Sequence, residues 1–217
     1  MGYGELWEAT HVEFLQAAWA TLRLAFGALL IGLLVGLLVA LARLSSRRPL
    51  RRAALCYIEL FRGTPALVQL FIVYFTLTEV GVHFSSFQAA MIGLGLNAAA
   101  YLAEIYRAGL EAVPKGQVEA ARAIGMTRAR VLRWVVLPQA IRIVLAPIGN
   151  VAISLLKDTS VASLIAAPDL MLRAQDLSSV YFMPLEIYIL VGAMYFAMCY
   201  PLSLGVRLLE RRASRGR

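Results

Sequence analysis

Charged residues are scarce in this sequence: they make up 16% of the 217 residues, whereas an average soluble domain has about a quarter. The sequence also has only two histidines and two cysteines. The cysteines, Cys56 and Cys199, lack the spacing of a metal site or a redox pair, so we expect them to be packing residues. No stretch fits the GxxxxGK[ST] pattern of a nucleotide-binding loop. These absences argue against a soluble domain, a metal site or an ATPase.

Long uncharged runs fill the space between the charges. Three of these runs each reach roughly 20 residues, enough for a helix to cross a ~30 Å hydrocarbon layer. They are Leu24 to Ala42, Phe84 to Ala103 and Ile187 to Val206. The sequence therefore predicts an all-α integral membrane protein with a single domain over residues 1–217 and five transmembrane helices. We expect the spans at about 22–42, 53–80, 87–110, 134–156 and 185–208, with a polar cytoplasmic loop at 111–133.

The basic residues are unevenly distributed. Most of the 21 lie in three clusters that a five-span layout puts on one side of the membrane. The clusters are Arg43, Arg47, Arg48, Arg51 and Arg52; Arg107, Lys115, Arg122, Arg128, Arg130 and Arg133; and Arg207, Arg211, Arg212, Arg215 and Arg217. The opposite side carries only Arg173. By the positive-inside rule, the N-terminus is predicted to lie outside and the C-terminus in the cytoplasm. The net charge of +8 therefore does not indicate nucleic-acid binding.

The polar loop contains the pattern of a short amphipathic helix. Pro114 precedes it, at a position where proline is tolerated. Val118, Ala121 and Ile124 then recur at helical spacing on one face. Gly125 follows where a helix commonly ends in a left-handed residue. We expect a small rod lying outside the bilayer, of the kind that docks into a groove of another protein.

Prolines and glycines interrupt the predicted spans. Pro65 is expected to kink or break the second span because it removes a backbone donor. The fourth span contains Pro138 and Pro147, and we expect it to lie in the bundle interior, where protein or water satisfies the freed backbone groups. Gly32 and Gly36 have GxxxG spacing, which indicates close approach of another helix, either within the same subunit or from another one.

Polar residues recur at helical spacing along the inner spans. The stripes are Asn150, Ser154 and Lys157; Asn97, Tyr101 and Glu104; and Gln69, Thr76 and Glu79. Because polar groups in a membrane are expensive, these stripes predict a shared wet interior. Hydrogen bonding between helices, without any substrate role, is the alternative for Asn97, Tyr101 and Ser154.

Two neighbouring pairs of opposite charge need separate interpretation. Glu104 and Arg107 stand at i, i+3, so we expect a structural or gating pair, near Arg62 at the inner end of the second span. Lys157 and Asp158 together offer both signs of charge, as an amino acid requires, and Glu79 adds a second outer carboxylate that would favour a cationic side chain. A local ion pair closing the helix is the alternative for Lys157 and Asp158.

Several motifs also show a family resemblance. One stretch resembles the EAA loop of ABC-transporter permease subunits. In it, Glu119-Ala120-Ala121 is followed by Gly125 and, twelve residues after Gly125, by Leu137-Pro138, although Val135 replaces the usual isoleucine. Three further stretches resemble the polar amino-acid uptake branch of that family: ELFRGTPALVQLF (Glu59 to Phe71), AAYLAEIYRAGLEAVPKGQ (Ala99 to Gln117) and SLLKDTSVAS (Ser154 to Ser163). The resemblance covers most of the chain, from about Arg43 onward.

The resemblance implies a type I importer permease that carries a polar amino acid across a bacterial cytoplasmic (inner) membrane, with arginine-like, glutamine-like and opine-like substrates all open. It implies that Glu119, Ala120, Ala121 and Gly125 form a coupling helix seated on an ATPase. It also places the Lys-Asp-Thr-Ser stretch, including Thr159, by the translocation path. The implied partners are two ATPase subunits, which would bind the ATP and Mg²⁺, a second permease subunit, an external binding protein, and lipid; this chain itself is expected to bind no cofactor.

Two other classes of function make different demands on the sequence. An intramembrane enzyme would need paired carboxylates, metal ligands or a nucleophile with a base, but His11 and His83 both fall in outer segments and neither cysteine has a histidine partner by spacing. A passive channel or a scaffold would share the docking loop but would work without nucleotide. ATP dependence of uptake distinguishes that class from an importer.

Overall fold

The structure is a computed structural model that describes residues 3–76, 79, 81 and 83–214. Every element in the described part is helical. They are α1 (Tyr3–Arg43), α2 (Arg48–Gly63), α3 (Ala66–Phe71) with the π-helical turn η1 (Ile72–Thr76), α5 (Ser86–Glu111), α6 (Lys115–Ala123), α7 (Arg128–Val131) with the π-helical turn η2 (Leu132–Val136), α8 (Leu137–Asp158), the 3₁₀ helix η3 (Thr159–Ile165), α9 (Leu170–Tyr181) and α10 (Pro184–Ser214).

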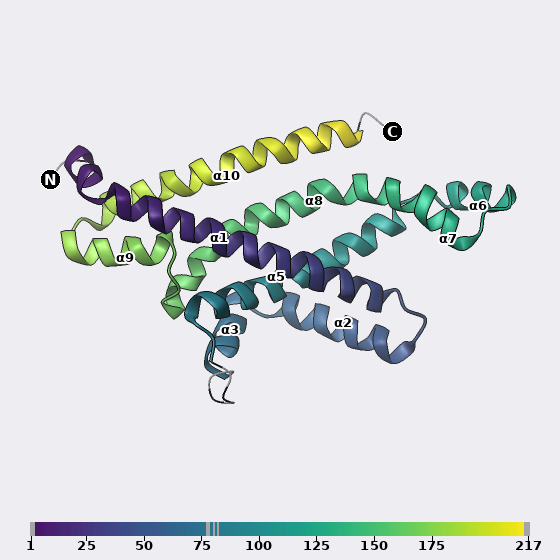
Figure 1. The fold of residues 1–217 in the computed structure, drawn as a ribbon, viewed down its shortest axis with the longest axis horizontal. Helices are drawn as coiled ribbons and strands as arrows, with labels where there is room; N and C mark the ends of the chain where they lie inside the picture. Colours follow the sequence, from purple (N-terminus) through teal and green to yellow (C-terminus); the bar gives the residue numbers. More distant parts are fainter. Residues whose placement is uncertain (1–2, 77–78, 80, 82, 215–217) are drawn as a thin grey trace.

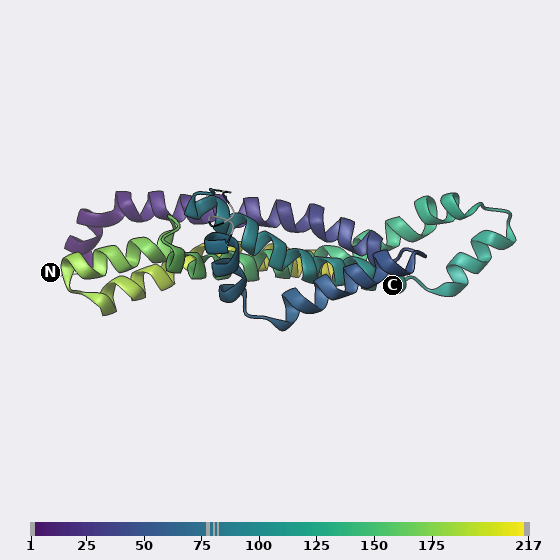
Figure 2. The same ribbon diagram turned by 90° about the horizontal axis from the view of Figure 1, so that it is seen from below.

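The long helices run along one axis of an elongated bundle (Figures 1 and 2). α9 and the start of α1 lie at one end, and α6 and α7 project from the other. In the described part, four helical segments are long and apolar enough to cross a membrane, and the pair Arg48–Gly63 and Ala66–Thr76 makes a fifth if it counts as one bent span. The predicted all-helical membrane fold is confirmed, and α1 extends well before residue 22, to Tyr3.

The centre of the bundle is α5, not α8. Of the apolar stretch of α5, 56% is buried, against 28% for the stretch that contains α8. The expectation that the fourth span occupies the interior was therefore wrong for the single chain. The reason lies in the side chains of α5, which carries a run of buried alanines and glycines such as Gly93, Gly95 and Ala99. Small side chains let α1, α2, α3 and α8 approach its backbone closely.

The glycines of α1 face α5 within the same subunit. A Cβ atom added at Gly36 would lie 2.9 Å from the Ala99 carbonyl oxygen and 3.0 Å from Leu102 Cβ. A Cβ atom at Gly32 would lie 3.1 Å from Ala98 Cβ. Of the two interpretations of the GxxxG spacing, packing inside the subunit is the one the structure shows.

We expect Gly36→Val to destabilise the bundle by about 1–3 kcal/mol, because backbone atoms of α5 cannot move aside for the new side chain. Gly205→Val is the matched control, since a Cβ atom at Gly205 on α10 would meet no atom within 4 Å. Thermal unfolding in detergent measures both variants. Equal unfolding temperatures for the two would contradict the close packing of α1 on α5.

A buried aspartate fixes α9 to the bundle. Asp169 begins α9, and its Oδ1 accepts a hydrogen bond from the Leu172 backbone N–H at 2.8 Å. Thr21 Oγ1 of α1 accepts one from the Leu170 N–H at 2.9 Å. Both side chains are buried, and burial raises the pKa of Asp169 to about 6. The α9 end of the molecule thus contains a carboxyl group whose pKa is raised towards neutral pH.

Asp169 is expected to make the stability of the fold depend on pH. A carboxyl whose pKa is raised by folding binds its proton more tightly in the folded state, so its contribution is full below about pH 4 and is lost as the pH rises to about 6. The loss is at most about 3 kcal/mol. Unfolding temperatures of the native chain should fall across this range, whereas those of Asp169→Asn should not. Parallel curves for the two proteins would exclude this carboxyl as the cause.

Candidate functional site

A sharp break at Pro65 shapes one wall of the candidate site. α2 and the α3–η1 segment meet at 111°, so the expected kink is a full interruption of the helix. Two amides hold it in place. Gln69 Nε2 donates to the Phe61 carbonyl oxygen at 2.8 Å, and Asn97 Nδ2 of α5 donates to Gln69 Oε1 at 2.9 Å. Because these amides satisfy a carbonyl freed by the break, Gln69 and Asn97 have a structural role at this position.

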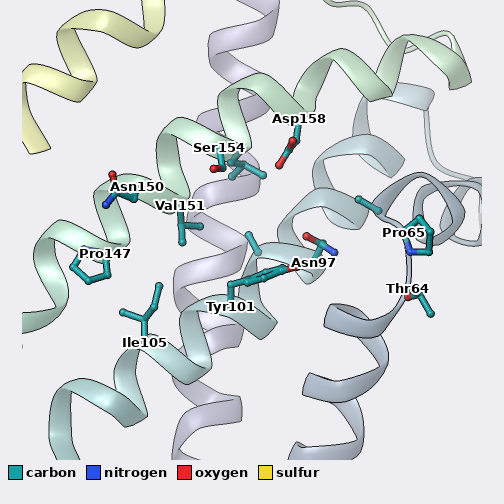
Figure 3. Close-up of a pocket in the computed structure, with 13 residues that line it drawn as sticks. Thr64, Pro65, Asn97, Tyr101, Ile105, Pro147, Asn150, Val151, Ser154 and Asp158 are labelled. Carbon is teal, nitrogen blue, oxygen red and sulfur yellow. The ribbon is translucent and has the colours of Figure 1, made fainter. Parts of the chain in front are cut away.

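A cavity of about 700 Å³ lies between this break, α5 and α8. Its walls comprise Thr64, Pro65, Ala66, Asn97, Ala98, Tyr101, Ile105, Pro147, Asn150, Val151, Ser154, Leu155 and Asp158. Figure 3 shows Asp158 turned from α8 towards Asn97 and Tyr101 of α5. The structure therefore brings together five residues of the predicted substrate path: Asn97, Tyr101, Asn150, Ser154 and Asp158.

Three other predicted path residues do not line this cavity. Lys157 opens into a separate space of about 320 Å³ that includes Tyr188 and Tyr195 of α10. It is adjacent to Asp158 in sequence, but one helical residue turns the side chain by about 100°, which points it towards a different neighbour. Thr159 is fully buried, and its Oγ1 donates to the Leu156 carbonyl oxygen at 2.7 Å. Glu79 is exposed beyond η1.

The two charges of the Lys157–Asp158 pair are therefore separated rather than combined. Among the ion pairs of the described residues, neither side chain takes part. The local ion pair that was the alternative is thus not formed. The cavity contains one carboxylate, that of Asp158, and it faces the polar edge of α5.

Charged residues gather at the other end of the cavity, towards α6. Another space of about 320 Å³ lies there, and its walls are formed by Arg62, Tyr101, Glu104, Ile105, Arg107, Ala108 and Val151. Arg107 Nη2 lies 2.7 Å from Glu104 Oε2, and Arg107 also pairs with Glu111. The predicted pairing of Glu104 with Arg107 is confirmed. Arg62 instead places its guanidinium over the Tyr101 ring, 5.5 Å from the ring centre.

The polar loop contains the predicted rod as α6. Gly125 has φ +83° and donates its N–H to the Arg122 carbonyl oxygen at 2.9 Å, while the Met126 N–H reaches the Ala121 carbonyl oxygen at 3.1 Å. This is the left-handed helix ending predicted for Gly125. Glu119 and Ala120 are exposed, whereas Ala121 is buried against its own chain. Of the residues assigned to coupling, Ala121 packs against the rest of the chain and does not belong to the exposed face of the rod.

Ile124 departs from the face predicted for it. It is 80% exposed, although helical spacing put it with Val118 and Ala121. The reason is that α6 ends at Ala123, so the helical angle no longer applies one residue later. An apolar side chain thus stands at the tip of the rod, beside Gly125. The position of Ile124 directly before Gly125, where the helix was predicted to end, is the sequence signal that could have predicted this exposure.

Apolar members of the cavity wall were also missed. Pro147 and Val151 lie on the same face of α8 as Asn150, Ser154 and Asp158. Their spacing of four residues was visible, but a search for polar stripes passes over apolar side chains.

Comparison with known proteins agrees with this geometry. A family model described as the binding-protein-dependent transport system inner membrane component matches residues 32–215. The L-cystine transport system permease protein TcyB of Bacillus subtilis (strain 168) is 42% identical over 196 residues, which is 90% of this chain and 84% of that protein. The probable amino-acid ABC transporter permease protein YckA of the same organism is 40% identical over 192 residues, 88% of this chain and 85% of that protein.

A solved structure shows the same fold. The crystal structure of an amino acid ABC transporter with histidines aligns with a TM-score of 0.92 at 41% identity, covering 98% of this chain and 99% of that chain. The match to the family model extends over most of the described helices, from α1 to α10. The chain therefore belongs to the family of binding-protein-dependent transport system inner membrane components.

Proposed function

We propose that this chain is the membrane-spanning subunit of an ABC importer that carries a polar amino acid. The observation that carries the proposal is the cavity between the Pro65 break, α5 and α8. Its volume of about 700 Å³ falls within the range of small-molecule sites, roughly 300–1,000 Å³. Asn150, Ser154 and Asp158 offer hydrogen bonds and one negative charge inside a helical membrane bundle. The relatives named above, a cystine permease and an amino-acid permease, support this substrate class.

Energy for transport comes from partner subunits. We assign the docking surface to the exposed face of α6, formed by Glu119 and Ala120 with Ile124 at its tip. Two ATPase subunits would bind ATP and Mg²⁺ and seat this face, while a second permease subunit closes the open side of the cavity and an external binding protein delivers the substrate. ATP binding then shifts the equilibrium between outward-open and inward-open arrangements.

The proposed location is the cytoplasmic membrane of a bacterium, with the N-terminus outside and α6 in the cytoplasm. The arrangement in space supports this orientation, because the α1–α2 turn, the α6–α7 segment and the end of α10 lie towards the same end of the molecule (Figure 1). These are the segments that carry the basic clusters, which the positive-inside rule places on the cytoplasmic side.

The test is uptake into proteoliposomes that contain this chain, its ATPase and its binding protein. A panel of labelled amino acids, including arginine, glutamine, cystine and an opine, is offered with and without ATP inside. We expect uptake of at least one of them, dependent on both ATP and the binding protein. Equal uptake without ATP would identify a passive channel, and the importer assignment would then be wrong.

A further inference from the structure

Two cavities meet at one side chain of α5. The larger space of about 700 Å³ and the smaller, charged space of about 320 Å³ share Tyr101, Ile105 and Val151 in their walls. Arg62, Glu104 and Arg107 line only the smaller one, whereas Asn150, Ser154 and Asp158 line only the larger one. Between a polar chamber and a charged vestibule, the structure thus places an aromatic ring with two aliphatic neighbours.

Arg62 holds the ring from the vestibule side. Its guanidinium lies 5.5 Å from the centre of the Tyr101 ring, within the range of a cation–π contact. The other arginine of the vestibule, Arg107, is already occupied by Glu104 and Glu111. Arg62 takes no part in the ion pairs of the described residues. Glu104 nevertheless lines the same vestibule as Arg62.

The backbones of both partners are anchored in the bundle, so any movement of the pair is left to the side chains. Tyr101 belongs to α5, the most buried of the candidate spans in the described part. Arg62 belongs to the last turn of α2, directly before the 111° break. α2 is anchored one turn earlier by Ile58, which is buried with Ala103 of α5. Beyond that anchor, the Phe61 carbonyl oxygen accepts hydrogen bonds from Gln69 and Asn97, which hold the end of the helix. The exposed Arg62 side chain can therefore change rotamer while the backbones at Arg62 and Tyr101 stay in place.

We propose that Tyr101, with Arg62 stacked on it, is the gate at the α6 end of the transport cavity. The proposal rests on the proposed function, in which this cavity is the substrate path. In the closed arrangement, the stacked ring and the side chains of Ile105 and Val151 separate chamber from vestibule. The gate opens when the Arg62 side chain turns from the ring towards the Glu104 carboxylate, which frees the Tyr101 side chain to change rotamer.

The test measures access to the chamber from the α6 side. Cys56 and Cys199 are replaced by serine, and Ser154→Cys supplies a reporter in the chamber wall. The full chain, co-expressed with its ATPase, is labelled in inside-out membrane vesicles with a membrane-impermeant maleimide, in the absence of ATP and amino acid. We expect Tyr101→Ala to raise the labelling rate by about tenfold or more, since it removes the separating wall and so shifts the closed–open equilibrium.

Matched variants separate the gate from a general loosening of the bundle. Arg62→Gln changes an exposed side chain and should raise labelling by roughly 2- to 5-fold, the effect of losing a cation–π contact at an exposed site. Tyr101→Phe keeps the ring and should label at the parent rate. Tyr200→Ala removes an exposed tyrosine of α10, outside both cavities, and should also leave the rate unchanged.

Parent-like labelling of both Tyr101→Ala and Arg62→Gln would overturn the gate, as would labelling of Tyr101→Phe as fast as that of Tyr101→Ala. The measurement uses neither ATP nor substrate, so it is independent of the uptake experiment. Faster labelling combined with absent uptake would leave the gate in place and refute the proposed function. Uptake combined with unchanged labelling in the variants would support the proposed function and refute the gate.

Discussion

Replacing Glu119 by lysine is expected to reduce ATP-driven uptake to background while the chain still inserts into the membrane. Glu119 is exposed on α6, and Ala121 on the opposite face holds the rod against its own chain. Charge reversal at Glu119 therefore leaves the packing of the bundle intact. It changes the docked interface, where loss of a buried charged contact costs about 2–5 kcal/mol. Uptake in proteoliposomes and co-purification of the ATPase measure the two effects.

The control for this variant is Glu210→Lys. Glu210 is exposed near the end of α10 and has the same charge, but it lies outside the proposed docking face. It should keep both uptake and ATPase binding. If Glu119→Lys transported as well as Glu210→Lys, Glu119 would be an ordinary solvated charge and the docking face would lie elsewhere.

The second large effect is expected at Asp158. Its carboxylate is the negative charge of the cavity wall, and no residue of that wall carries a positive charge. If the substrate has a cationic group, that group is expected to pass this carboxylate. Asp158→Asn keeps the size and polarity of the side chain and removes the charge. Hydrogen bonds to charged groups contribute about 1.5–3 kcal/mol, so uptake of a cationic amino acid should fall by roughly 10- to 100-fold.

Two comparisons make this experiment specific. Asp176→Asn removes an exposed carboxylate of α9 that does not line the cavity, and it should transport normally. Lys157→Gln should also have little effect, because Lys157 opens into a different space. Unchanged uptake in Asp158→Asn, or an equal loss in Lys157→Gln, would show that the substrate follows another route.

Local features of this fold were predictable from the sequence because each rests on short-range chemistry. Pro65 lacks a donor wherever it stands, and the helix does break there. Gly125 ends α6 in a left-handed conformation, which few other residues adopt without strain. Glu104 and Arg107 pair because residues three apart on a helix are neighbours. In each case, one or a few adjacent residues decide the outcome.

Features that depend on how helices face one another were not predictable in the same way. Lys157 and Asp158 were assigned to one site because they are adjacent in sequence, but α10 packs beside one and α5 faces the other. Asn97 was given a path role, although its amide holds the broken end of α2 through Gln69. The central position of α5 follows from its small side chains, whose effect appears only when four neighbouring helices are in place.

The most direct test of the account is to find which side of the membrane α6 faces. Ala120→Cys, in a chain whose Cys56 and Cys199 are replaced by serine, puts a reporter on the exposed face of the rod. An impermeant maleimide should label it in inside-out vesicles and not in intact cells, and addition of the purified ATPase should protect it. Labelling in intact cells would place α6 on the outer surface, beyond the reach of any cytoplasmic ATPase, and would contradict the proposed coupling.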